Sequence, residues 1–367
     1  MNTTLKEITR TTRQITRRKQ IQPSQTRQYS QSNPEIHAAQ KYCSDLLRKY
    51  DRPSYTLHTF IPRPAQSFYL ALRALNVSLS LIPETTTSHT IGLMRLQFWR
   101  ESITKVLAGS PPKEPIAILL SSAIEDLHAR TQGRARVSKG WFTRLINARE
   151  RALTNDPYPD IAALESYAEN TYSTLMYLTL SALPVASVTA DHVASHVGKA
   201  VGIAAVLRGL PLVAFPGAGG SGQGRQGAVM LPLDVMAQAG VKEEEVFRLG
   251  AEAPGLRDAV FTVATRASDH LITVQQMLSN LQAGQDVGHA FEHEGEEGHE
   301  YEVHGERQES PLDEVNRAFG VFMPAVGTRL WLDRLQKVDF DIFRPELLTS
   351  EWKLPWKAYM AFKRKSL

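Results

Sequence analysis

The helical spacing of apolar residues is the feature that most restricts how this chain can fold. Between positions 90 and 108, Leu96, Trp99, Ile103 and Val106 recur at three- and four-residue steps, which places them on one face of a helix. Alternation with a period of two, typical of half-buried strands, is hardly seen in the sequence after residue 35. We therefore predict an all-α protein. The segments expected to be helical are 63–82, 90–108, 115–127, 139–153, 160–183, 191–207, 256–282 and 312–338.

Two segments interrupt this helical pattern. Residues 215–227 are dominated by glycine, whereas residues 284–311 are acidic and polar with interspersed glycines. Neither composition can build a packed core. We interpret both segments as flexible insertions in one helical domain that spans residues 36–362.

Positive charge is concentrated in the first 34 residues. They hold seven Lys or Arg residues and one acidic residue, a net charge of +6, whereas the whole chain carries +4. The remainder is therefore close to neutral, at −2, which argues against a nucleic-acid-binding surface. The leader is rich in Arg, Ser and Thr and has no apolar core, as is typical of a mitochondrial transit peptide. We predict that residues 1–30 are such a peptide; the alternative is a basic tail that binds acidic partners.

Cysteine and histidine give little support for a metal site. Cys43 is the only cysteine, so one chain can form neither an internal disulfide nor a cysteine-based zinc cluster. His192 and His196 stand one helical turn apart and could share a metal ion, but the sequence offers no third ligand nearby. We predict no metal site and no cofactor.

The sequence also limits how the chain can meet a membrane. Its apolar stretches are broken, for example by Arg208 and Pro211, so a membrane-spanning helix is not expected. Between Trp352 and Lys365, aromatic residues are interleaved with basic ones. This pattern suits an anionic membrane surface, and it suits equally a terminal helix docked on the core with a solvated basic face.

Three blocks of sequence carry a resemblance to a known family. They are ALRALNVSLSLIPE at 71–84, LMRLQFWRES at 93–102, and GKAVGIAAVLR at 198–208 followed by GAVMLP. In this order they resemble the squalene/phytoene synthase family, which implies a single helical domain of the isoprenoid synthase type around a central cavity. The strings ESYAENTYSTLMYLTL and KVDFDIFRP resemble a mitochondrial branch of this family that assists the assembly of respiratory complex I. That branch implies a location on the matrix side, peripheral to the inner membrane, and complex I subunits or other assembly factors as partners.

The same resemblance supplies a test for catalysis. Active members ionise a prenyl diphosphate, and aspartates from two facing helices hold the Mg²⁺ ions that assist departure of the diphosphate. The two expected sets of aspartates fall on Ser80, Leu81 and Glu84, and on Gly209 and Val213. Only Glu84 could still bind a cation, and no Asp or Glu occurs between positions 192 and 233. We therefore expect no catalytic residue and a non-catalytic assembly factor; the alternatives are a transferase with residual activity on prenyl diphosphates and a carrier of lipid or isoprenoid.

Several polar residues on apolar helices are candidate ligand contacts. Arg208 shares a helix face with apolar residues, where an unpaired guanidinium would be costly. It could bind a phosphate without metal, together with Arg73 and Lys199. Alternatively, it could pair with Glu169 on the neighbouring helix. Glu169 and Asn170 interrupt an apolar helix, and buried polar groups of this kind usually satisfy one another.

Overall fold

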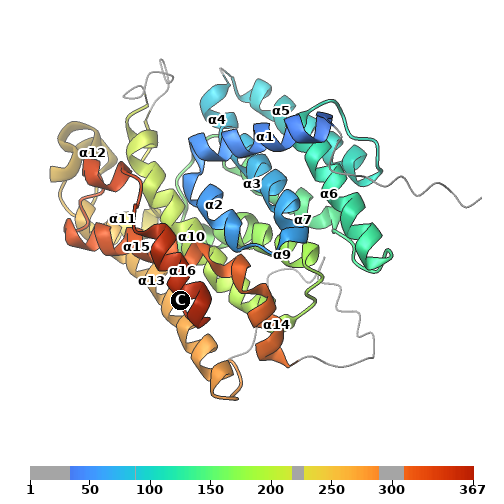
Figure 1. Ribbon diagram of the computed structural model, residues 1–367. Helices are drawn as coiled ribbons and strands as arrows, with labels where there is room; N and C mark the ends of the chain where they lie inside the picture. The colour runs from blue at the N-terminus through green and yellow to red at the C-terminus, as the bar shows by residue number, and fades with distance from the viewer. Residues whose placement is uncertain (1–33, 87, 217–226, 289–309) are drawn as a thin grey trace, which may run out of the picture. The chain divides into compact units, whose positions relative to one another are not determined.

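The computed structural model describes residues 34–86, 88–216, 227–288 and 310–367 (Figure 1). Within these ranges the chain forms sixteen α-helices and no β-strand, which confirms the all-α prediction. The predicted transit peptide and most of both predicted insertions lie outside the described residues. The α-helices are α1 (Pro34–Tyr50), α2 (Arg52–Leu57), α3 (Gln66–Ser80), α4 (Ile82–Thr85), α5 (His89–Leu107), α6 (Pro115–Thr131), α7 (Lys139–Arg151), α8 (Ile161–Ala168), α9 (Thr174–Ala182), α10 (Val188–Ala214), α11 (Leu233–Ala239), α12 (Glu243–Leu249), α13 (Leu256–Gln282), α14 (Pro311–Ala318), α15 (Pro324–Lys337) and α16 (Leu354–Arg364).

Polar residues fix where the central helices begin. Asp160 precedes α8, and its carboxylate accepts a hydrogen bond from the backbone N–H of Ala163 at 2.7 Å. Ser187 precedes α10, and its hydroxyl accepts from the N–H of Ala190 at 3.2 Å. Each bond satisfies a donor that the first helical turn leaves unpaired. A single N-cap residue therefore marks the start of each of these two helices.

α10 is the central helix of the fold. It packs against α8, α9, α13 and α15, and Figure 1 shows it running between the helices α1 to α7 and the helices α11 to α16. It continues through Pro211 to Ala214, beyond the predicted end at residue 207. Pro211 lies in the last turn and lacks the N–H that would donate to the carbonyl of Leu207, so one helical hydrogen bond is missing there. By length and composition α10 could cross a membrane, but 56% of its apolar stretch is buried in the fold, which is the environment of a core helix.

A π-helical segment, η3 (Glu169–Ser173), joins α8 to α9 where the sequence pattern predicted regular α-helix. A π turn holds one residue more than an α turn, so it changes which side chains share a face. α10 passes very close to this segment. A Cβ atom on Gly198 would lie 2.4 Å from the Cα of Ser173, and one on Gly202 would lie 2.4 Å from the Cβ of Ala168. Only glycine permits this approach.

Candidate functional site

The first set of expected acidic positions lies at the end of α3 and in the short helix α4. The Ser80 hydroxyl donates a hydrogen bond to the carbonyl of Val77 at 2.9 Å. Leu81 joins the two helices and is half-buried. Glu84, the one carboxylate of the set, is exposed to solvent. This set therefore supplies a single carboxylate, which is exposed to solvent, and no second acid to share a magnesium ion.

The second set of expected acidic positions lies in the last turns of α10. Gly209 and Val213 are both half-buried and bear no acid. A Cβ atom on Gly209 would meet nothing within 4 Å, so there is open space at this expected position. In the described part of the chain no three His, Cys, Asp or Glu side chains are arranged to hold a metal ion.

Three arginines from three helices share Tyr172 of η3 as an electrostatic neighbour, and we call them the arginine cluster. They are Arg73 of α3, Arg149 of α7 and Arg208 of α10, and Tyr172 lies within electrostatic reach of all three. The Arg149 guanidinium carbon is 5.7 Å from the centre of the Tyr172 ring. That of Arg208 is 5.0 Å from the centre of the Trp331 ring on α15. Arg73 and Arg149 are only 4% and 9% exposed, so these cations are held in the interior.

The arginine cluster is short of negative charge. Among the described residues no carboxylate forms an ion pair with any of its three members, and Asp51 is the carboxylate that acts on Arg73 and Arg208 from a greater distance. Burial lowers the pKa of Arg208, and the neighbouring Arg334 lowers it as well. The Nε atoms of Arg73 and Arg149 are buried without a hydrogen-bond partner. Because buried cations are costly unless neutralised, this site favours an anion and disfavours a divalent cation.

Arg149 and Tyr172 are members of the site that the sequence analysis missed. Arg149 donates hydrogen bonds to the Tyr167 hydroxyl at 2.6 Å and to Oδ1 of Asn76 at 2.8 Å. A signal for it exists in the sequence, because Arg149 follows Leu145 by four residues and so continues the apolar face of α7. An arginine on such a stripe is buried, and it needs partners from other helices.

Glu169 does not pair with Arg208, so the alternative pairing is wrong. The buried Glu169 carboxylate accepts hydrogen bonds from the Tyr177 hydroxyl at 2.6 Å and the Ser195 hydroxyl at 2.8 Å. Burial raises the pKa of Glu169, but the bond from Tyr177 and the charge of Lys199 bring it below its usual range. Lys199 precedes Arg208 by nine residues, about 2.5 helical turns, so the two lie on opposite sides of α10. Lys199 therefore belongs with Glu169 and not with the arginine cluster.

Asn170 also lies apart from the arginine cluster. Its amide donates to the backbone carbonyl of Ser166 at 2.7 Å, and its side-chain oxygen accepts from Arg144. Of the five candidate contacts taken from the sequence, Arg73 and Arg208 both lie within electrostatic reach of Tyr172 and Asp51. The other three form separate polar contacts around the π-helical segment.

A chain of ionisable side chains links α8, α10 and α13. Glu165 accepts hydrogen bonds from Arg266 and from Nε2 of His270, the latter at 2.8 Å. The other ring nitrogen of His270 lies 2.9 Å from Nδ1 of His196, whose ring is 5.2 Å from that of His192. Burial raises the pKa of Glu165, but the bonds from His270 and Arg266 outweigh it and set that pKa at about 2. These contacts are those of a structural polar network.

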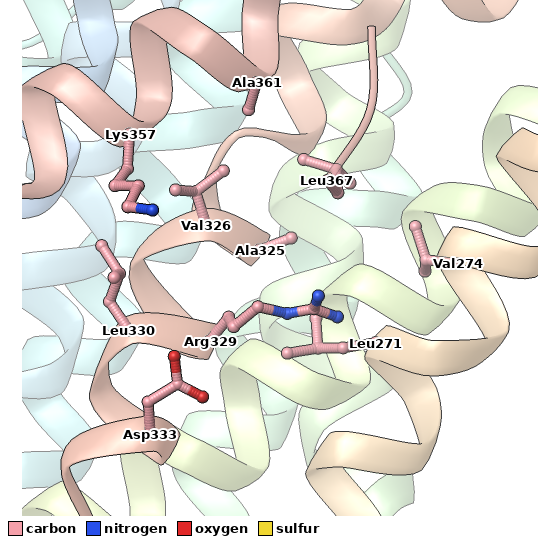
Figure 2. Close-up of a pocket in the computed structure, with 10 residues that line it drawn as sticks. All are labelled: Leu271, Val274, Ala325, Val326, Arg329, Leu330, Asp333, Lys357, Ala361 and Leu367. Carbon is pink, nitrogen blue, oxygen red and sulfur yellow. The ribbon is translucent and has the colours of Figure 1, made fainter. Parts of the chain in front are cut away.

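An apolar pocket of about 210 Å³ lies between α13, α15 and α16 (Figure 2). Its charged groups are Arg329, Asp333 and Lys357. Burial lowers the pKa of Arg329, and Asp333 partly compensates for this. The remaining lining residues are Leu271, Val274, Ala325, Val326, Leu330, Ala361 and Leu367. Nothing in the sequence pattern predicted this pocket, because its walls come from helices far apart in the chain.

Comparison with known proteins shows which family the chain resembles over most of its length. The family model described as squalene/phytoene synthase matches residues 47–359. A relative from Rattus norvegicus named "NADH dehydrogenase (ubiquinone) complex I, assembly factor 6" is 34% identical, over 91% of this chain and 85% of its own. The protein of the same name from Homo sapiens is 32% identical over the same shares.

Solved structures share the fold at low sequence identity. A dehydrosqualene synthase in complex with ligand superposes with a TM-score of 0.60 at 14% identity, covering 90% of this chain and 99% of its own. A squalene synthase from Alicyclobacillus acidocaldarius gives a TM-score of 0.57 at 14% identity, covering 84% and 96%. The expected helical domain of the isoprenoid synthase type is thereby confirmed.

Proposed function

Because this chain belongs to the squalene/phytoene synthase family, in the branch of the complex I assembly factor 6 proteins, we propose that it is a non-catalytic assembly factor for respiratory complex I. The observation that carries the proposal is the reversal of charge in the site. Of the expected acidic positions only Glu84 bears a carboxylate, whereas three arginines lie within electrostatic reach of Tyr172.

The chemistry of the parent family explains why this reversal matters. A prenyl diphosphate ionises when Mg²⁺ neutralises the departing diphosphate, and the ions must be held by carboxylates. Loss of one such electrostatic stabiliser typically costs about 3–4 kcal/mol in the barrier. With Ser80, Leu81, Gly209 and Val213 in place of acids, several stabilisers are lost together. We expect ionisation to be abolished.

The proposed place of action is the mitochondrial matrix, peripheral to the inner membrane. Two observations support it: the basic, acid-poor composition of residues 1–30 and the complex I assembly role in the names of the relatives. The proposed partners are complex I subunits or other assembly factors. The near-neutral body of the chain gives no reason to expect nucleic acid.

Two measurements test this function together. Cells that lack the protein should lose assembled complex I on native gels and regain it with the wild-type chain. The purified full chain should release no diphosphate from farnesyl or geranylgeranyl diphosphate in the presence of Mg²⁺. Diphosphate release that a chelator abolishes and the Glu84→Gln variant weakens would instead support the residual transferase. Normal complex I in the deletion cells would contradict the assembly role.

The arginine cluster favours a second role, the metal-free binding of an anionic ligand such as an isoprenoid or lipid phosphate. The buried, unpaired Nε atoms of Arg73 and Arg149 are the specific observation. Hydrogen bonds to charged groups contribute about 1.5–3 kcal/mol each, so Arg208→Gln should weaken binding about 10- to 100-fold.

Thermal unfolding with inorganic diphosphate, farnesyl diphosphate or phosphatidic acid as probe measures this binding. At least one probe should raise the melting temperature of the wild type and not that of Arg208→Gln. Lys105→Gln, on the exposed face of α5, is the matched control and should respond like the wild type. Equal responses of wild type and Arg208→Gln to every probe would contradict the role. Mass spectrometry of extracted lipid identifies any ligand that co-purifies.

A further inference from the structure

The outer face of α16 and of the turn before it is unusually apolar for a surface. Trp352, Trp356 and Tyr359 are 81%, 66% and 50% exposed. Leu348, on the approach to this helix, is 64% exposed. Large aromatic side chains usually bury most of their area in a folded domain, so a group of exposed ones points to a surface that is covered in use.

The register of α16 explains why these side chains face outward together. Leu354 and Ala358 are buried on the inner side, and the Phe362 ring packs 5.3 Å from that of Phe60. Positions 356, 359 and 363 follow steps of three and four residues, so they share the opposite side of α16, and the exposed Trp352 lies in the turn just before the helix. We call Trp352, Trp356, Tyr359 and Lys363 the outer stripe. The inner contacts hold the helix in place, and on the outer side the Trp356 and Tyr359 rings lie 6.3 Å apart.

Positive charge runs along the outer stripe. Lys353, Lys357 and Arg364 are exposed, and the Lys353 ammonium lies 5.5 Å from the centre of the Trp352 ring. The one acidic residue of this stretch, Glu351, is half-buried and forms an ion pair with Arg334 at 3.7 Å. Its charge is therefore already neutralised. The stretch presents aromatic rings and uncompensated cations side by side.

We propose that the outer stripe is a docking surface for a lipid bilayer that contains anionic phospholipids. Tryptophan and tyrosine suit the boundary between headgroups and acyl chains because their rings are apolar with one polar edge, and lysine and arginine are attracted to anionic headgroups. Lys357 also lines the apolar pocket beneath α16, together with the cation Arg329 and the anion Asp333 (Figure 2). The proposal rests on the peripheral membrane location in the proposed function, and it names the surface and the lipid class.

Vesicle binding of the purified full chain tests the proposal. The wild type should sediment with vesicles of phosphatidylcholine mixed with phosphatidylglycerol, and much less with phosphatidylcholine alone. Replacing Lys353 and Lys357 by Gln should weaken binding on the order of 30-fold, because each cation near an anionic surface contributes about a factor of five. The triple variant Trp352→Ser, Trp356→Ser, Tyr359→Ser should lose binding.

Met94→Ser with Phe98→Ser is the matched control. These side chains are 67% and 45% exposed on α5, so the control removes exposed apolar side chains from another surface and should leave vesicle binding unchanged. Quenching of tryptophan fluorescence by brominated lipid gives a readout on the wild type that needs no variant. Absence of binding or of quenching by anionic vesicles, equal binding by the triple variant, or an equal loss in the control would each overturn the proposal.

The outcomes separate this proposal from the assembly role. If deletion cells lose complex I while the purified protein does not bind anionic vesicles, the docking proposal is wrong and the assembly role stands. If vesicles bind but deletion leaves complex I intact, the assembly role is wrong and the surface stands. If the triple variant binds vesicles normally yet fails to restore complex I, the outer stripe contacts a protein and the lipid proposal is overturned.

Discussion

Replacing Gly198 by alanine tests how closely α10 must approach the π-helical segment. The added Cβ would lie 2.2 Å from Oγ of Ser173 and 2.4 Å from its Cα and backbone nitrogen. Two of these three atoms belong to the backbone and cannot rotate away. The helices must therefore separate by about 1 Å to reach ordinary van der Waals distances, and with them move Glu169 and Tyr172.

Two opposing terms decide the magnitude. Alanine is favoured over glycine inside a helix by about 0.5–1 kcal/mol. Overpacking a well-filled interior costs about 1–3 kcal/mol, and a clash with backbone belongs at the upper end of that range. We therefore expect Gly198→Ala to lower the free energy of unfolding by about 2 kcal/mol.

Gly209 provides the matched control on the same helix. A Cβ there meets nothing within 4 Å, so Gly209→Ala gains the helix propensity without a clash. It should raise the free energy of unfolding by about 0.5–1 kcal/mol, which makes the two identical substitutions differ by about 3 kcal/mol. Urea unfolding of the purified chain, followed by far-UV circular dichroism, measures both. The packing argument is refuted if Gly198→Ala stays within the range of Gly209→Ala.

Three further predictions follow from single side chains. The pKa of Glu165 is about 2 in the fold against an ordinary value of 4.5, so the ionised carboxylate contributes stability above pH 4.5 that is lost as the pH falls towards 2. Glu165→Gln should lower the free energy of unfolding by about 1–2 kcal/mol at pH 7, after allowance for solvent screening. Between pH 4.5 and 2 the free energy of unfolding of this variant should depend less on pH than that of the wild type. Glu169→Gln keeps the shape but loses the charge that strengthens the bond from Tyr177, so urea unfolding should show a loss of about 1.5–3 kcal/mol. Burial raises the pKa of the Cys43 thiol to about 12, so a thiol-reactive dye should label it only on unfolding, and rapid labelling of the native chain would contradict its burial.

Most of the fold could be predicted from the sequence because helical periodicity reports burial directly. The stripe through Leu96, Trp99, Ile103 and Val106 became the buried side of α5. The end of α10 was predicted too early, since Pro211 forbids only one backbone bond and the apolar side chains around it favour continuing the helix. The π-helical segment was missed because one extra residue in a turn leaves no clear trace in an apolar helix.

The site was harder to predict because it depends on which helices meet. The sequence alone shows that most of the expected acidic positions bear no acid. It does not show which basic and aromatic side chains lie near one another in the fold. Arg73 and Arg208 were identified as inward-facing cations, whereas Lys199 was assigned to the wrong side of α10 by proximity in the sequence. The step of nine residues from Lys199 to Arg208 corresponds to about 2.5 helical turns, which already predicts that the two side chains lie on opposite sides of the helix. Arg149 needed the knowledge that α7 lies against η3.

If the arginine cluster binds an anion, as proposed, occupancy and the stability of the protein are linked. An anion held by the buried guanidinium groups of Arg73 and Arg149 would bind only the native state, so it would shift the unfolding equilibrium towards the folded chain. At a concentration one hundred times its dissociation constant, such an occupant adds about 2.7 kcal/mol, a substantial share of the stability of an ordinary domain. Starving a cell of that compound would then lower the amount of this protein through proteolysis, so that a shortage of metabolite would mimic loss of the gene.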